Sequence, residues 1–156
     1  MGEAFDKTAK MLNLGYPGGP AVEKFAKQGD KNYYKLPKPI INKAGCNLSF
    51  AGLKTAVLIQ SKKINNDEKL KFNLAASFQE TIIKILNKKT EVAFNEFKIF
   101  SKKGKNLFVI AGGVAANQSI RKSLEKLSKK NNFKTIFTHL KFCGDNAAMI
   151  AWTGIQ

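Results

Sequence analysis

The sequence predicts an α/β fold that is mainly helical. Two observations support this class. Short apolar runs at 107–111 and 135–139 flank an amphipathic pattern at 117–130, which is the strand–helix–strand order of a parallel α/β unit. Upstream, apolar residues recur at helical spacing over a long stretch that begins near Asp67. The composition, 44% hydrophobic and 24% charged over 156 residues, is typical of a globular domain with its own core.

The N-terminal part is expected to form short helices joined by turns. Residues 3–14 carry apolar residues at helical spacing. GYPGGP at 15–20 ends this helix and starts the next one, because proline fits the first turn of a helix. KNYYKLPKP at 31–39 is expected to be extended, since a residue before proline avoids the helical region. A loop at 45–52 then leads into a further short helix.

The apolar positions of the long helical pattern are expected to form much of the core. These positions are Leu70, Leu74, Phe78, Ile82, Ile85 and Leu86. The pattern leaves open whether one helix continues through Phe97 or breaks and restarts. SKKGKN at 101–106 is a polar turn before the strand–helix–strand unit, and a last helix is expected to begin near Asp145.

The formal net charge of +16 comes almost entirely from lysine, because Arg121 is the single arginine among 27 basic residues. Several of the lysines stand in pairs, at 62–63, 88–89, 102–103 and 129–130. Lysine lacks the planar fork with which arginine binds phosphate and guanine. The pattern therefore indicates solvated lysine-rich faces more than a surface for a polyanion. The charge therefore permits an RNA partner without showing one.

Neither a membrane span nor a secretion signal is expected. The longest apolar runs, such as 107–110, are far too short to cross a bilayer. MGEAFDKTAK carries two acids early and lacks the apolar centre of a signal peptide. Cys46 and Cys143 have no CxxC spacing and are expected to be reduced thiols in a cytoplasmic protein, with Cys143 buried.

The junction LFVIAGGVAANQSIR at 107–121 has two interpretations. A strand that ends in glycines and feeds a helix exposes backbone N–H groups and the positive end of the helix dipole, where a ligand can approach the backbone closely. Asn117 could there contact a hydroxyl or a base. The plainer interpretation is a turn with Asn117 as a helix cap, because the glycine spacing fits neither GxGxxG nor the P-loop.

Four separated stretches resemble successive signature blocks of one family, the TsaD group, whose members make threonylcarbamoyladenosine in transfer RNA and were long labelled glycoproteases. The stretches are GEAFDKTAK with GYPGGP (2–20), LSFAGLKTA (48–56), IAGGVAAN (110–117) and FCGDNAAMIA (142–151). The resemblance spans nearly the whole chain. It implies that residues 1–156 form a single lobe, the C-terminal portion of an actin-like (ASKHA), two-lobed α/β fold.

The resemblance also implies a reaction. The family moves a threonylcarbamoyl group from threonylcarbamoyl-AMP to the exocyclic amine of the adenine next to the anticodon. Position by position, Asp6 matches a residue that binds the ribose, Gly19 one that packs against the ligand, and Asn117 another substrate contact; none is assigned a catalytic role. Without the resemblance, Asp6 would pass as a solvated charge and Gly19 as a turn glycine. Glu23 stands where some members place a ligand-binding aspartate, and it is left unassigned.

A divalent metal ion, usually taken to be iron, is implied as a cofactor. In the family it is held by two histidines of an HxxxH motif and by the aspartate of the DNAAM block, which is Asp145 in this chain. On residue type alone Asp145 would be a helix cap. HxxxH does not occur in the sequence, and His139 is its single histidine. We expect an incomplete metal site, because a lone carboxylate holds iron weakly.

The implied partners are threonylcarbamoyl-AMP, tRNA, TsaB- and TsaE-like proteins and the N-terminal lobe of the family, with no membrane. Three readings of the chain stay open. It is the C-terminal part of a transferase that is active only with the other lobe. Alternatively, it is an inactive, truncated or split member that acts at most as a tRNA- or protein-binding module, or an unused remnant. In each case the isolated chain is expected to be inactive.

Overall fold

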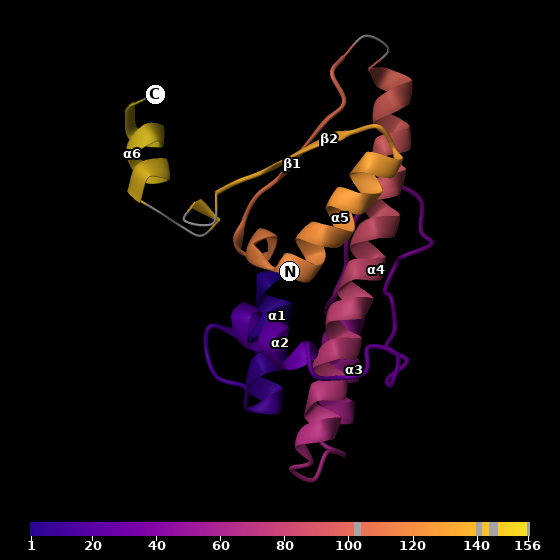
Figure 1. Cartoon of the computed structure of the whole chain (residues 1–156), viewed down its shortest axis with the longest axis vertical. Coiled ribbons are helices and arrows are strands. Elements are labelled where there is room, and N and C mark those ends of the chain that lie inside the picture. The colour runs from indigo at the N-terminus through magenta and orange to yellow at the C-terminus, as the bar shows by residue number, and fades with distance from the viewer. Residues whose placement is uncertain (102–103, 140–141, 144–146, 156) are drawn as a thin grey trace. The chain divides into compact units, whose positions relative to one another are not determined.

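The computed structural model describes residues 1–101, 104–139, 142–143 and 147–155. The chain divides into two compact units, Met1–Lys105 and Asn106–Gln156. Helices make up the first unit, and the second contains a small parallel sheet with a helix between its strands (Figure 1). The mainly helical α/β content is as predicted, whereas the actin-like architecture and the single lobe over 1–156 stay predictions.

The first unit contains four α-helices. They are α1 (Gly2–Leu12), α2 (Gly18–Ala26), α3 (Ala51–Ser61) and α4 (Glu68–Phe100). Helices α2 and α3 pack on α4, and α1 packs on both α2 and α3 (Figure 1). The two predicted N-terminal helices are confirmed, with ends that differ by about two residues.

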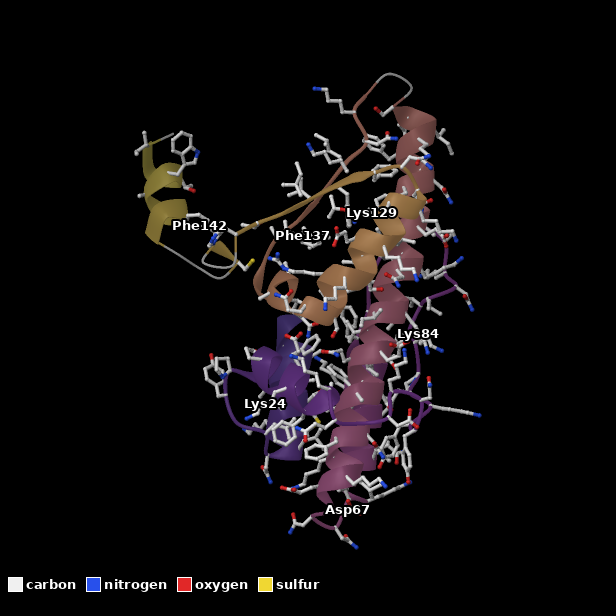
Figure 2. The ribbon with its side chains drawn as sticks, in the orientation of Figure 1. Lys24, Asp67, Lys84, Lys129, Phe137 and Phe142 are labelled. Atoms are coloured by element: carbon white, nitrogen blue, oxygen red, sulfur yellow. The ribbon has the colours of Figure 1, made fainter. Side chains whose placement is uncertain are left out.

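Helix α4 is one unbroken helix of 33 residues. The sequence left open whether the helical pattern breaks before Phe97, and it does not. The helix begins where the Asp67 side chain accepts a hydrogen bond from the Leu70 N–H at 3.1 Å, and Figure 2 labels Asp67 at that end. No glycine or proline interrupts it. Its buried face includes Phe78, whose ring meets the Phe5 ring edge-on with centroids 5.1 Å apart.

Residues 27–50 join α2 to α3 without a helix or a strand, and polar side chains of α4 hold this segment in place. Asn73 Oδ1 accepts a hydrogen bond from the Asp30 N–H at 2.8 Å. Ser77 Oγ accepts another from the Tyr34 N–H at 3.1 Å. Backbone groups of a segment without regular structure thus find partners on a helix more than 40 residues away in the sequence.

Lys89 corrects the prediction that the paired lysines lie on solvated faces. Its side chain is only 3% exposed. The Nζ ammonium donates hydrogen bonds to the carbonyls of Lys43 at 2.5 Å and Gly45 at 3.0 Å. A buried ammonium needs such acceptors to offset its loss of water. Lys89 therefore holds the segment 27–50 to α4.

The second unit has the predicted strand–helix–strand order. Its elements are β1 (Leu107–Ile110), the 3₁₀ helix η1 (Gly113–Ala116), α5 (Gln118–Lys130), β2 (Lys134–Phe137) and α6 (Ala147–Ile155). β1 and β2 pair in parallel, with Leu107 opposite Lys134 and Ile110 opposite Phe137. Both strands end earlier than predicted, so His139 lies beyond β2.

Two features of this unit differ from the expectations or lie outside the described residues. The 3₁₀ helix η1 was not predicted, because four small residues give no apolar periodicity. Asp145, where the last helix was expected to begin, is outside the described residues, and α6 begins at Ala147. Among the helices described, none is both long and apolar enough to span a membrane.

Candidate functional site

Asp6 lies on α1 and caps the start of a different helix. Its Oδ1 accepts a hydrogen bond from the backbone N–H of Gly18, the first residue of α2, at 3.1 Å. Pro17, at the N-cap position of α2, has no side-chain acceptor, and a carboxylate near a helix N-terminus is favoured by the helix dipole. Asp6 is nevertheless exposed, so a solute can reach its carboxylate. The prediction that it binds a ribose stays untested.

The two glycines at the start of α2 differ in what their surroundings allow. A Cβ on Gly18 would lie 2.5 Å from the Cα of Asp6, so the close approach of α1 and α2 requires glycine there. A Cβ on Gly19 would meet no described atom within 4 Å. Packing within the described chain thus accounts for Gly18 but not for Gly19. This leaves room for the predicted ligand contact at Gly19, which itself is untested.

An open hollow of about 680 Å³ lies along α1, beside Asp6. It is lined by Glu3, Asp6, Lys7, Ala9, Lys10, Asn13, Gly15 and Tyr16. Its size is in the range of small-molecule sites. The exposed wall of this hollow is mainly apolar, although its lining includes the carboxylates of Glu3 and Asp6 and the ammonium groups of Lys7 and Lys10. The Glu3 carboxylate is already paired with Lys7 and Lys54, whereas Asp6 remains exposed.

Glu3 connects this hollow with the LSFAGLKTA stretch. Its Oε1 lies 2.7 Å from Lys7 Nζ and 3.2 Å from Lys54 Nζ, which belongs to α3. The hydrogen bonds from Lys7 and then Lys54 lower the pKa of Glu3 below its ordinary value. The contact between Lys54 and Glu3 ties α3 to α1.

In the second unit, the glycine junction forms a turn followed by a capped helix. Gly112 adopts φ 87°, a conformation that favours glycine, and η1 follows at once. Asn117 is the N-cap of α5, and its Oδ1 accepts a hydrogen bond from the Ile120 N–H at 3.0 Å. Its side chain is buried. The interpretation as a cap is thus confirmed, and the predicted substrate contact stays a prediction.

Replacement of Asn117 by alanine is expected to destabilise the second unit by about 1 kcal/mol, because it removes the cap of α5. Asn117→Asp keeps an acceptor oxygen and is expected to restore most of this stability. The measurement is amide hydrogen exchange at Ile120, together with urea unfolding. If Asn117→Ala left the exchange at Ile120 unchanged, the hydrogen bond would not hold the helix start.

The described residues do not provide a complete metal site. Over the described parts of the chain, no group of three or more histidine, cysteine, aspartate and glutamate side chains could hold an ion. His139 is exposed, and its ring lies 6.4 Å from that of Phe142. Asp145 is outside the described residues. The donors that are described therefore do not form, by themselves, a site for the divalent ion that the resemblance implies.

The structure assigns the predicted site residues to two places. Asp6 and Gly19 belong to the first unit, where Gly18 joins them, and Asn117 belongs to the second. Sequence reasoning did not single out Arg121 as a site residue, although the structure places its guanidinium beside the glycine junction. The available signal was its uniqueness among the basic residues. Cys143, 4% exposed, is buried as predicted.

Comparison with known proteins assigns the family. The model of the family TsaD, tRNA N6-adenosine threonylcarbamoyltransferase, matches residues 1–152. A relative of that name from Pelagibacter ubique (strain HTCC1062) is 58% identical over 156 residues, which are all of this chain and 43% of the relative. One from Thermosipho africanus is 49% identical over 155 residues, or 99% of this chain and 45% of the relative. One from Rickettsia rickettsii (strain Sheila Smith) is 50% identical over 159 residues, or 100% and 46%.

The chain thus spans less than half the length of these curated relatives. The family match covers both units, including the stretches that carry Asp6, Gly19 and Asn117. This confirms the family that the four signature stretches indicated. The chain therefore belongs to the TsaD family of tRNA N6-adenosine threonylcarbamoyltransferases.

Proposed function

We propose that this chain is the nucleotide-binding part of a tRNA adenosine threonylcarbamoyltransferase. The observation that supports the proposal is the family match over residues 1–152. Relatives that are 49–58% identical bear the name of this transferase. The substrate would be threonylcarbamoyl-AMP, and the acceptor the exocyclic amine of the adenine next to the anticodon in tRNA.

The proposed reaction is an acyl transfer. The adenine nitrogen attacks the carbamoyl carbon of threonylcarbamoyl-AMP, a C–N bond forms, and the C–O bond to the phosphate breaks. AMP leaves with the electron pair, and the nitrogen loses a proton to solvent. In this scheme Asp6 accepts hydrogen bonds from ribose hydroxyls, Gly19 lets the ligand approach the backbone, and Asn117 contacts the substrate. These groups bind and orient the substrate; none transfers the proton.

The cofactor and the partners are part of the same proposal. Asp145 would supply one ligand to a divalent ion, proposed to be iron, with further ligands from outside the described residues. Such an ion offsets the repulsion between a carboxylate and a phosphate. Lysine side chains would attract tRNA, and TsaB- and TsaE-like proteins would assist. The proposed location is the cytoplasm.

The test is a transfer assay with unmodified tRNA and threonylcarbamoyl-AMP. The isolated 156-residue chain is expected to transfer no threonylcarbamoyl group, because His139 is its single histidine and a three-ligand metal site cannot be assembled. Addition of the N-terminal portion of the Pelagibacter ubique relative, with the smaller partner proteins and Fe²⁺, is expected to produce modified tRNA. Transfer by the chain alone would contradict the need for that portion. No transfer by the folded, supplemented chain would overturn the proposed function.

The net charge of +16 favours one other candidate, a tRNA-binding module without catalysis. Such a module would bind tRNA with an affinity that falls steeply with salt, since binding lysines release counterions. It would support no transfer even in the supplemented assay. Measuring tRNA binding and transfer on the same samples separates this candidate from the transferase.

A further inference from the structure

The single arginine of the chain is placed where a lysine could not make the same contacts. Arg121 Nε–H donates a hydrogen bond to the carbonyl of Ala115 in η1. Its Nη2 donates to the carbonyl of Thr138 at 2.9 Å and lies 3.6 Å from the sulfur of Cys143. Its guanidinium also lies over the ring of Phe137, 4.6 Å from the centroid.

We infer that Arg121 is a positioning residue that clamps the segment after β1 to the segment after β2. The first segment, 111–117, contains the glycines and Asn117. The second, of which residues 138–139 and 142–143 are described, lies shortly before Asp145 in the sequence. Neither the family match nor the predicted site residues assign Arg121 such a role. Its consequence for the ligand rests on the proposed function, whereas the clamp itself does not.

The parallel sheet explains why both segments lie within reach of one side chain. The ends of β1 and β2 lie at the same edge of the sheet, because Ile110 is opposite Phe137. The N–H of Thr138 then donates to the Ile110 carbonyl at 3.1 Å. A Cβ on Gly113 would lie 4.0 Å from the carbonyl oxygen of Cys143. The two segments are therefore neighbours, and Arg121 links them with hydrogen bonds to both.

The guanidinium fixes the Asn117 segment from a second direction. The backbone N–H of Arg121 donates to the Asn117 carbonyl at 3.0 Å, as expected one turn into α5. The guanidinium then reaches back to Ala115, so that one residue holds the chain on both sides of position 116. A planar fork can donate in several fixed directions at once, whereas an ammonium on a flexible stem is a point charge. The clamp thus explains why position 121 is an arginine although all remaining Lys and Arg positions of the chain are lysine.

The unique arginine makes the clamp directly observable. Labelling with ¹⁵N-arginine gives one side-chain Nε–H signal for the whole chain. In the wild type this proton is expected to exchange with water much more slowly than that of free arginine, because it is held on Ala115. Exchange at the rate of free arginine would overturn the inference.

Arg121→Lys keeps the charge and removes the fork. The lost hydrogen bonds are those that the charged guanidinium donates to the carbonyls of Ala115 and Thr138. Without them both segments open more often, so the amides of Ala115, Asn117 and Thr138 are expected to exchange about tenfold faster or more. Amides in the middle of α5 should not change. Lys122→Met, at the exposed neighbouring position on α5, is the matched control and should leave all these rates unchanged. Equal rates in Arg121→Lys and the wild type would overturn the clamp.

Rescue separates the fork from charge and from general loss of packing. In Arg121→Ala, millimolar guanidinium is expected to restore slow exchange at Ala115 and Thr138, and ammonium at the same concentration is not. Equal rescue by both cations, or by neither, would contradict a role for the fork.

The transfer assay then distinguishes this inference from the proposed function. In the supplemented enzyme, Arg121→Lys is expected to raise the KM for threonylcarbamoyl-AMP about tenfold with a smaller change in kcat, while the unfolding midpoint stays near that of the wild type. If the enzyme is active and KM is unchanged, the positioning role is wrong and the function stands. If no transfer occurs with the wild type, the function is wrong and the exchange measurements still decide the clamp.

Discussion

Replacement of Phe78 by alanine is expected to lower the free energy of unfolding of the first unit by about 3–5 kcal/mol. Phe78 is fully buried in the N-terminal half of α4, and its ring packs edge-on against Phe5 of α1. Truncation removes buried apolar surface and leaves a cavity that the surrounding helices fill only in part. The measurement is urea unfolding followed by the helical circular dichroism signal.

Phe100 provides the matched control, since it lies on the same helix and is 86% exposed. Phe100→Ala is expected to change the free energy of unfolding by no more than about 0.5 kcal/mol. Similar losses in Phe78→Ala and Phe100→Ala would show that the first unit has no core centred on Phe78.

Replacement of Asp6 by alanine is expected to weaken binding of threonylcarbamoyl-AMP roughly tenfold or more in the supplemented enzyme. A hydrogen bond to a charged group contributes about 1.5–3 kcal/mol, and 1.4 kcal/mol corresponds to a factor of ten in affinity. Asp6→Ala also removes the acceptor for the Gly18 N–H, so a loss of affinity could reflect a displaced α2. Affinity is measured by calorimetric titration, with the unfolding midpoint measured in parallel.

Asp6→Asn separates these two effects. Its amide oxygen can still accept from Gly18, whereas the negative charge that binds ribose hydroxyls is gone. We expect Asp6→Asn to keep most of the stability of the wild type, with a small loss because the helix dipole favours a charged carboxylate, and to lose most of the affinity. Glu68→Gln, an exposed change in the first turn of α4, is the control for loss of one negative charge. If Asp6→Ala and Asn117→Ala both bind the ligand as the wild type does, these residues are only helix caps.

The sequence determined the elements of secondary structure and the family. Apolar spacing is a local property, so it located the helices and the strand–helix–strand order at 107–139. Asparagine before a helical pattern indicated the cap at Asn117, because capping involves only the next three residues. The signature stretches identified the family, which the match over residues 1–152 confirmed. The unpredicted helix η1 shows the limit of periodicity, since four small residues have none.

Only the tertiary structure decided which residues these elements bring together. Asp6 looked like a solvated charge, and it caps a helix that begins 12 residues later. Lys89 looked like one of many surface lysines, and it is buried on two backbone carbonyls more than 40 residues away. In the sequence Arg121 is notable only as the single arginine, whereas in the structure its guanidinium contacts the segments that follow both strands. Each role depends on a backbone group that has no partner in its own element and that packing brings close to the side chain. No local sequence pattern shows which distant segment will supply that group.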